Sequence, residues 1–409
     1  MKRTAAPLLA AAGVATALGL AGPAAGVGWV ALGRLSAWAG SALLLASLLF
    51  MLREPVLTRQ LGGWEAMLRA HHHSGVWAYV LLLIHPLALA AGHDDALGAW
   101  QRLVAPPGRL GWAALLLLML GLGTTFSRQV SDRRWRPLHG LLGLGVLLGL
   151  VHAALLTVHI GLAWVTLALA LAALAWRLAV VNRGLTAQPY RVTAVAHPAD
   201  GVVELALQPE TTALKVAAGQ FVLARFQAQA PYGGCGEFHP FTVSGGTAEG
   251  GLRVSVKALG RCSGRIQAVP VGAQALLQGP FGEFLPGAAA GPRLWVAGGI
   301  GITPFMAALR AQPCRVATTL IYLARTPADA AFLDELQALE REEPSFQLLF
   351  QAGDSAELAL DALLPQVDRL AERQVHICGP APLVRALRPR LAKAGVAPGA
   401  VQVESFQLR

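Results

Sequence analysis

The chain has 409 residues, which is enough for about two or three domains, and 55% of them are hydrophobic while only 14% are charged. Soluble domains usually carry about 25% charged residues, so the composition argues against a purely cytosolic protein and against a disordered one. The formal net charge is +10, but the basic residues flank apolar segments and do not form one stripe, which excludes a nucleic-acid-binding surface as the explanation.

The N-terminal part, residues 1–183, consists mainly of long apolar runs. A helix that crosses a bilayer needs about 20 mostly apolar residues, and six segments of this kind are present. They cover residues 7–27, 29–52, 71–92, 110–127, 138–158 and 160–182. The first segment also fits a secretory signal peptide that is cleaved near residues 23–26. We expect it to be retained, which gives a six-helix transmembrane bundle.

Basic residues in the short loops predict the orientation of these helices. Lys2 and Arg3 precede the first segment, and four arginines lie between residues 128 and 136, whereas the loop 93–109 offsets its two arginines with two aspartates. We therefore expect a multi-pass protein of the inner (plasma) membrane. Its N-terminus and the domains after residue 183 should face the cytoplasm.

Four histidines lie within two of the predicted spans, where an ionisable side chain is costly and indicates function. His71 and His85 are fourteen residues apart on one span, and His139 and His152 are thirteen residues apart on another. At 1.5 Å per residue, each pair covers roughly 20 Å of membrane depth. The two spans run in the same direction, so we expect His71 to face His139 and His85 to face His152. Two b-type haems require this arrangement, with His72 as the alternative inner ligand.

Two imidazoles on one haem iron occupy both axial positions, so a haem held in this way transfers electrons and binds no substrate at iron. An external acceptor would therefore take its electron at the edge of the outer haem. Arg34, near the outer end of the second segment, is a candidate partner for a haem propionate. An interfacial arginine that reaches towards water is the alternative.

After residue 183 the pattern changes to short strands separated by Gly and Pro, which predicts an antiparallel β-barrel over residues 188–287. We expect strands at 190–207, 220–227 and 252–258, and a helix that begins at Ser263. Helix N-termini present free N–H groups to phosphate, so this domain is predicted to bind FAD, with a simple capped turn at the helix start as the alternative. The predicted FAD residues are His239, Pro240, Phe241, Thr242, Val243, Ser244, Lys257, Gly260, Cys262 and Ser263.

Residues 291–409 alternate between strand and helix patterns, which predicts an α/β domain with a parallel sheet. A strand at 293–297 leads into a glycine loop that lets the backbone approach a pyrophosphate, and a second strand follows at 317–324. The loop differs from the GxGxxG sequence, so it is no ordinary dinucleotide fingerprint. The predicted NAD(P)H residues are Gly298, Gly299, Gly301, Ile302, Thr303, Pro304, Arg325, Cys378, Gly379 and Pro380.

For two of these residues, Arg325 and Cys378, the sequence also predicts a specific role. Arg325 follows the second strand, where an adenosine ribose would lie, and its guanidinium favours NADPH through the 2′-phosphate, with NADH as the alternative. Cys378 is expected beside the nicotinamide as a catalytic residue, a buried structural thiol being the alternative. The chain's four cysteines show no zinc spacing, no iron–sulfur spacing and no dense disulfide framework.

Eight short motifs of this chain occur together in one known superfamily. They are Gly33-Arg34, Gly62-Gly63-Trp64, His85-Pro86, Trp135 through His139, His239–Ser244, Gly298–Pro304, Cys378-Gly379-Pro380 and Glu404-Ser405-Phe406. The whole chain resembles the ferric reductase and NADPH oxidase superfamily, a six-helix haem domain fused to a ferredoxin-reductase-type flavoprotein, and most closely the minimal bacterial NADPH oxidases. The resemblance implies that Phe406 stacks on the flavin ring and takes part in catalysis, with a core phenylalanine as the alternative.

Two positions depart from that superfamily. His72 replaces a basic residue that commonly follows the first haem histidine. Leu89 stands where the vertebrate oxidases carry a further histidine, which weakens the case for dioxygen as the acceptor.

From these observations we expect an oxidoreductase that contains two haems b and FAD and that uses NADPH. It would transfer electrons across the lipid bilayer to a small extracytoplasmic acceptor. Dioxygen, giving superoxide, is the first choice and a ferric chelate the second. A third alternative is an electron-donating subunit for a periplasmic reductase such as a methionine sulfoxide reductase. We expect no nucleic acid and no obligatory protein partner.

Overall fold

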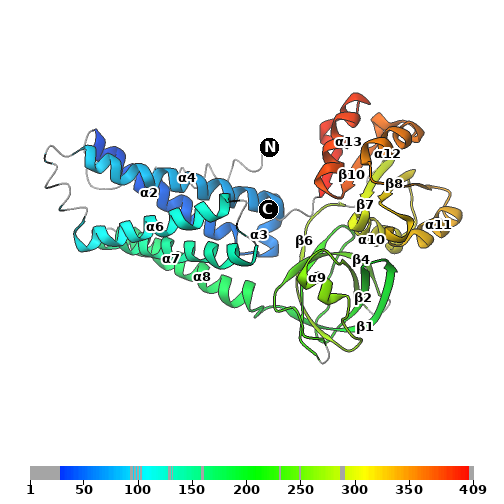
Figure 1. Cartoon of the computed structure of the whole chain (residues 1–409), viewed down its shortest axis with the longest axis horizontal. Coiled ribbons are helices and arrows are strands. Elements are labelled where there is room, and N and C mark those ends of the chain that lie inside the picture. The colour runs from blue at the N-terminus through cyan, green and yellow to red at the C-terminus, as the bar shows by residue number, and fades with distance from the viewer. Residues whose placement is uncertain are drawn as a thin grey trace. The chain divides into compact units, whose positions relative to one another are not determined.

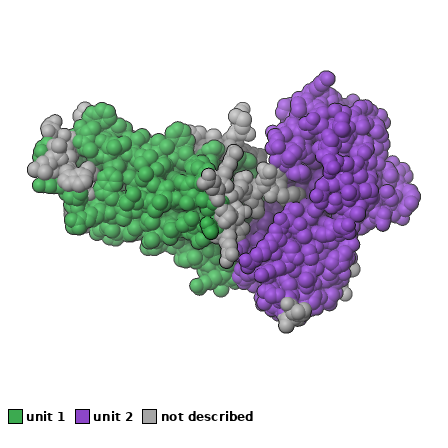
Figure 2. Space-filling model, in the orientation of Figure 1, with its two compact units in different colours: residues 1–185 green, residues 186–409 purple. Residues whose placement is uncertain are grey.

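The computed structural model describes residues 28–92, 95, 98, 101, 104–127, 130, 132–157, 161–229, 232–247, 250–285 and 291–404. The chain divides into two compact units, residues 1–185 and residues 186–409 (Figure 2). The first unit is helical, and the second combines strands with short helices (Figure 1). The predicted segment 7–27 and Phe406 lie outside the described residues.

The described part of unit 1 consists of apolar helices. They are α2 Trp29–Phe50, α3 Pro55–Gln60, α4 Trp64–Ala91, α6 Pro106–Phe126, α7 Asp132–Leu156 and α8 Gly161–Trp176, which continues as the π-helical stretch η1 Arg177–Asn182. Among the described residues, five helical segments are long and apolar enough to cross a membrane: 29–50, 64–91, 106–126, 137–156 and 163–182. Five of the six predicted spans therefore correspond to helices.

The helix starts differ from the predicted ones because hydrophobicity marks only the part of a helix that suits lipid. Helix α4 extends N-terminally to Trp64, where Gly62 and Gly63 interrupt the chain with φ angles of 89° and 93° that favour glycine. The short helix α3 was not predicted at all. It begins where the side chain of Glu54 accepts a hydrogen bond from the backbone N–H of Leu57 at 2.6 Å.

Two helix pairs build the bundle, α2 with α4 and α6 with α7. Glycines allow close approach within each pair: a Cβ atom at Gly40 would lie 2.8 Å from Leu82, and one at Gly121 would collide with Leu142. The buried core of the bundle draws on five helices and contains Leu43, Leu44, Ala78, Leu118, Val146, Leu150 and Ala170. This packing holds the two histidine-bearing helices, α4 and α7, in one bundle.

The first part of unit 2 is a closed antiparallel barrel. Its strands are β1 Gln188–Ala199, β2 Val202–Pro209, β3 Phe221–Phe226, β4 His239–Gly246, β5 Leu252–Lys257 and β6 Gln274–Phe281, in the order β1-β2-β5-β4-β3-β6, with α9 Arg261–Ile266 after β5. The single strand expected over 190–207 is wrong, because β1 and β2 form a hairpin. The chain reverses at Asp200-Gly201, where Gly201 adopts a φ angle of 63°.

The second part of unit 2 is a parallel five-stranded sheet in the order β11-β10-β7-β8-β9. Its strands are β7 Arg293–Gly298, β8 Thr318–Ala324, β9 Phe346–Ala352, β10 Gln374–Cys378 and β11 Val401–Glu404. Its helices are α10 Thr303–Ala311, α11 Leu333–Glu342, α12 Ala356–Leu363 and α13 Ala381–Lys393, with short 3-10 turns η2 Gly299–Ile302, η3 Pro327–Asp329, η4 Leu364–Gln366, η5 Leu370–Glu372 and η6 Pro398–Ala400. Strand β8 is buried along its whole length, as expected for a parallel strand that is covered on both faces.

Candidate functional site

The four histidines predicted from the sequence lie together in two pairs. The ring centroids of His71 and His139 are 6.0 Å apart, and those of His85 and His152 are 6.4 Å apart. A metal ion held at about 2 Å from each of two opposed imidazole nitrogens places the ring centroids roughly 6 Å apart. The ring of His72 packs instead against Phe126 at 5.9 Å. In this structure His71 is therefore the histidine that pairs with His139.

Each of the four rings is oriented by a hydrogen bond at its Nδ1 atom. The partners are the carbonyl oxygen (3.0 Å) and hydroxyl (2.7 Å) of Ser47 for His71, the carbonyl of Gly33 (2.8 Å) for His85, the hydroxyl of Thr125 (3.2 Å) for His139 and the carbonyl of Pro107 (2.6 Å) for His152. A carbonyl oxygen can only accept, so the proton of the ring lies on Nδ1 wherever a carbonyl is the partner. The Nε2 atom is then left as the ligand atom, the usual arrangement of metal-binding histidines.

The hydrogen bonds around His139 also place the ring proton on its Nδ1 atom, although its partner is a hydroxyl and not a carbonyl. The Thr125 hydroxyl donates to the carbonyl of Gly121 at 2.8 Å, so it accepts from Nδ1 of His139 and from the indole Nε1 of Trp135. The Trp135 ring also stacks on the His139 ring, with centroids 4.9 Å apart. The sequence motif included Trp135, but the partners Thr125, Ser47 and Pro107 carry no signal in the sequence.

A glycine keeps the ligand side of His152 clear. A Cβ atom at Gly111 of α6 would lie 3.0 Å from both Cε1 and Nε2 of His152. Any larger residue at this position would therefore press on the nitrogen that is free to bind metal. The paired rings, the satisfied Nδ1 atoms and this open space fit bis-histidine haems. Arg34 is exposed on α2, one residue after the carbonyl of Gly33 that orients His85.

The predicted flavin segment of β4 divides into two parts. His239, Pro240 and Phe241 are partly exposed, whereas residues 242–245 are buried. The Ser244 hydroxyl donates to the Glu204 carboxylate at 2.6 Å inside the barrel, and Val243 belongs to the barrel core. The accessible side chains of the motif are thus its first three.

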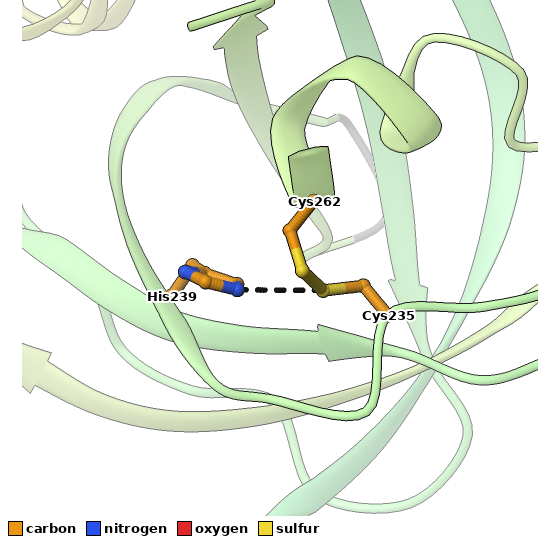
Figure 3. Close-up of side chains that lie close together, drawn as sticks. All are labelled: Cys235, His239 and Cys262. Carbon is orange, nitrogen blue, oxygen red and sulfur yellow. Dashed lines mark hydrogen bonds between the residues drawn. A yellow bond between two sulfur atoms is a disulfide. The ribbon is translucent and has the colours of Figure 1, made fainter. Parts of the chain in front are cut away.

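The second predicted flavin segment, 257–263, uses its side chains differently from the prediction. The Ser263 hydroxyl accepts hydrogen bonds from the N–H groups of Gly260 at 2.9 Å and Leu259 at 3.0 Å. Cys262 forms a disulfide with Cys235, a pairing that the spacing of the cysteines does not indicate. Figure 3 shows that His239 lies against this disulfide, with its Nε2 atom 3.3 Å from Sγ of Cys235.

Lys257 points to the sheet domain. Its Nζ atom is 3.8 Å from Oδ1 of Asp329, and the same oxygen accepts a hydrogen bond from Arg325 at 3.1 Å. Partial burial opposes ionisation of Asp329, but the hydrogen bond from Arg325 and the charge of Lys257 together hold its pKa below the ordinary value. Asp329 therefore neutralises the cation that was predicted to bind a 2′-phosphate.

The glycine loop and the Cys378-Gly379-Pro380 loop meet at the ends of the neighbouring strands β7 and β10, where Ala297 pairs with Cys378. A Cβ atom at Gly301 would collide with the Cys378 carbonyl, and one at Gly298 would lie 2.8 Å from Pro380. Open α/β sheets bind ligands at this edge, beyond the carboxyl ends of the strands. The side chains of Ile302, Thr303 and Pro304 are buried, whereas Gly298, Gly299 and Ile300 are partly exposed.

Cys378 is completely buried and lies opposite Glu404 of the adjoining strand β11. Burial, reinforced by the negative charge of Glu404, raises the pKa of the Cys378 thiol well above its ordinary value. The thiol is therefore neutral at physiological pH and can act as a weak hydrogen-bond donor, but not as a thiolate nucleophile.

Two family models match separate parts of the chain. Residues 36–150, which include three of the four paired histidines (all but His152), match the family described as ferric reductase like transmembrane component. Residues 295–388, which include the glycine loop and Cys378, match the oxidoreductase NAD-binding domain. The chain joins a ferric-reductase-like transmembrane domain to an oxidoreductase NAD-binding domain.

Curated relatives resemble about a third of this ferric-reductase-like chain. The carnitine monooxygenase reductase subunit of Escherichia coli is 31% identical over 143 residues, which are 35% of this chain and 43% of the relative. The glycine betaine monooxygenase reductase subunit of Chromohalobacter salexigens is 29% identical over 174 residues, which are 37% of this chain and 46% of the relative. The chain thus spans less than half the length of these two reductase subunits.

Solved structures also resemble the chain. A flavohemoglobin from Malassezia yamatoensis with bound FAD and heme aligns with a TM-score of 0.49 and 20% identity over 92% of this chain and 97% of its own. The FAD/NAD-binding domain of a nitric oxide dioxygenase from Vibrio cholerae aligns with a TM-score of 0.46 and 17% identity over 54% of this chain and 98% of its own.

Proposed function

We propose that this protein transfers electrons from cytoplasmic NADPH through FAD and two b-type haems to an acceptor on the other side of the membrane. The observation that carries the proposal is the pair of opposed histidine sets, His71 with His139 and His85 with His152, on apolar helices. The fourteen-residue step along α4 separates the two sets by roughly 20 Å. A series of redox centres at two depths is what movement of electrons across a bilayer needs.

The histidines do two things in this scheme. Their Nε2 atoms would hold the haem irons, and the carbonyl and hydroxyl partners at Nδ1 keep the rings in place and make them better donors to a metal. Haems held in this way supply one-electron chemistry without an open coordination site. Gly111 keeps a side chain away from the ligating nitrogen of His152.

In unit 2, the nucleotide would lie across the loops at the ends of β7 and β10. The backbone at Gly298 and Gly301 allows close approach. Lys257 and Arg325 would contact the phosphates in competition with Asp329, which both of them contact in this structure. The flavin would contact His239–Phe241 and the segment 260–263. FAD is needed because a nicotinamide delivers two electrons together and a haem accepts one.

For the acceptor we propose dioxygen, because the motifs resemble those of the minimal bacterial NADPH oxidases, with a ferric chelate as the second candidate. The match of residues 36–150 to a ferric-reductase-like family favours the second candidate. Leu89, which packs against Gly33 of α2, offers no proton-bearing group at that position for reduced oxygen.

The first experiment is a reduced-minus-oxidised spectrum of the purified full chain, with haem and flavin quantified per polypeptide. We expect two haems and one FAD, both reduced by NADPH. Cytochrome c reduction that is sensitive to superoxide dismutase would identify dioxygen as the acceptor, and a ferrozine signal under nitrogen would identify a ferric chelate. A chain with fewer than two haems would contradict the proposed route.

A further inference from the structure

The disulfide of the barrel has an imidazole and a carboxylate beside it. Cys235 lies in the segment before β4, and Cys262 lies in the first turn of α9. His239 places its Nε2 atom 3.3 Å from Sγ of Cys235 and 4.0 Å from Oε2 of Glu237 (Figure 3 shows the histidine and both cysteines). The ring nitrogen that faces the sulfur can donate a proton to it or accept one from it, so His239 is placed to act as an acid or a base for a thiol at Cys235.

The two sulfurs are not equivalent. Cys235 is 2% exposed, and its backbone N–H donates to the carbonyl of Phe226, whereas Cys262 is partly exposed. An attacking thiolate can therefore approach Sγ of Cys262, which makes Cys235 the leaving group. A thiolate leaves faster when a neighbouring group can donate a proton or a positive charge to it, and the Nε2 atom of His239 lies 3.3 Å from the sulfur that would leave.

The disulfide also connects the two segments to which the proposed function assigns the flavin. One side precedes His239, and the other lies within 260–263. Closing the disulfide limits the movement of α9 relative to the start of β4. A binding site whose parts are held in place binds more tightly than one whose parts must be ordered on binding.

We propose that Cys235 and Cys262 form a reversible dithiol–disulfide site that is reduced by a dithiol through Cys262 and that strengthens FAD binding when it is oxidised. A thiolate of the dithiol bonds to Sγ of Cys262, the Cys235–Cys262 bond breaks, and Cys235 leaves as a thiolate that takes a proton from His239. The second thiol of the reductant then attacks the mixed disulfide and releases Cys262. The dithiol is oxidised to its disulfide and the protein disulfide is reduced to two thiols. The part that concerns FAD rests on the proposed function.

A cytoplasmic location would make such a site regulatory, because cytoplasmic thiol pools keep most cysteines reduced and disulfides found there are usually catalytic or sensory. The other two cysteines provide internal references. Cys314 is partly buried and Cys378 is completely buried, and both are free thiols. Burial raises the pKa of Cys314 to about 11, so it should react slowly at pH 7.

The test follows the thiols of the full chain in detergent by maleimide labelling and mass spectrometry. In folded protein, a millimolar excess of dithiothreitol should open the disulfide. In the variant Cys235→Ser, Cys262 is left as a free thiol, and in Cys262→Ser it is Cys235 that is left. Cys262 should react with maleimide about tenfold faster than Cys235, because Cys262 is the more exposed of the two. Replacement of His239 by Gln should slow reduction of the disulfide about tenfold at pH 7, whereas the matched change His197→Gln, on an exposed part of β1, should not.

FAD affinity of the oxidised and reduced protein, from flavin fluorescence, provides the second measurement. We expect the reduced protein and the Cys235→Ser variant to bind FAD several-fold more weakly than the oxidised protein. Equal affinities would overturn the coupling to FAD. A disulfide that resists dithiothreitol until the protein unfolds would overturn the reversible site. Zinc retained by the reduced protein would also overturn it, because the ligand atoms of Cys235, His239 and Cys262 lie within 4.8 Å of one another and could form a metal site instead. The thiol measurements need no haem, so loss of the proposed electron route would leave them interpretable.

Discussion

Arg310 of α10 donates a hydrogen bond to Glu204 of β2 at 2.7 Å, which joins the sheet domain to the interior of the barrel. Glu204 is 4% exposed and also accepts hydrogen bonds from the hydroxyls of Ser244 and Ser255. The other edge of the guanidinium pairs with Glu335 of α11, and these two carboxylates raise the pKa of Arg310 further above its ordinary value despite partial burial. A buried charge is thus shared between the two halves of unit 2.

Replacing Arg310 by Leu should destabilise unit 2 strongly. The change leaves the Glu204 carboxylate buried without its nearest cation, and such losses cost about 3–5 kcal/mol. Arg253, at 3.4 Å from Glu204, will compensate in part. Thermal and denaturant unfolding would measure the loss. Arg341→Leu, on the exposed side of α11, is the matched control, and equal stability of the two variants would contradict the role of the ion pair. Addition of Glu204→Gln to Arg310→Leu should recover part of the loss.

The choice between His71 and His72 can be tested directly. His71→Ala should remove the inner haem, because its ring is the one beside His139, whereas His72→Ala should retain two haems. Haem per chain, measured as the pyridine complex, distinguishes the two results. Retention of both haems in His71→Ala would show that another side chain binds the inner iron.

Substitutions at two glycines of α6, Gly111 and Gly123, test the proposed outer haem site at His152 without removing a ligand. Gly111→Ala should perturb His152, because the new methyl group would lie 3.0 Å from Nε2, and should weaken or alter the outer haem spectrum. Gly123→Ala is the matched control, since a Cβ atom there meets nothing within 4 Å. The two variants remove a similar amount of backbone freedom, so a difference between them reports the space beside His152. Identical spectra would count against this site.

Arg325 and Asp329 should set the preference between NADPH and NADH. Arg325→Ala is expected to raise the KM for NADPH about tenfold or more, because a charged hydrogen bond contributes roughly 1.5–3 kcal/mol, while the KM for NADH changes little. Asp329→Asn removes the carboxylate that neutralises Arg325 and Lys257, so it should lower the KM for NADPH. Steady-state kinetics with both nucleotides would measure this, and a parallel change for NADH would refute a 2′-phosphate role.

The lowered pKa of His376 should make the stability of the folded protein depend on pH. Burial in β10, with a smaller contribution from Arg293, lowers its pKa from 6.5 to about 4 in the folded protein. The unfolded chain therefore binds a proton that the folded chain does not between pH 6.5 and about 4, and the folded state loses stability as the pH falls through this window. At about 1.4 kcal/mol per pH unit, the loss approaches roughly 3 kcal/mol near pH 4.

Denaturant unfolding at several pH values would measure this dependence. His376→Gln should flatten the change between pH 6.5 and 4, whereas His197→Gln, on an exposed part of β1, should leave it as it is in the unmodified protein. A slope that persists unchanged in His376→Gln would assign the pH dependence to other groups.

Local pattern accounts for much of what could be predicted. Apolar runs located five of the described helices, and the spacing of four histidines on two of them predicted the pairs His71–His139 and His85–His152. Glycine loops after short strands likewise predicted where β7 and β10 end. These features depend on the periodicity, length and composition of short segments, and all three can be read from consecutive residues.

Tertiary structure alone decided the rest, because it concerns contacts between residues that are far apart in the chain. The carbonyl of Pro107 reaches His152 across 45 positions, Arg310 reaches Glu204 across 106, and the Cys235–Cys262 disulfide closes a separation of 27. A single cysteine, carbonyl or carboxylate belongs to no repeating sequence pattern, so its partner cannot be predicted from the sequence. Their partners are chosen by how the barrel closes and the helices pack, and only the folded chain places them within bonding distance.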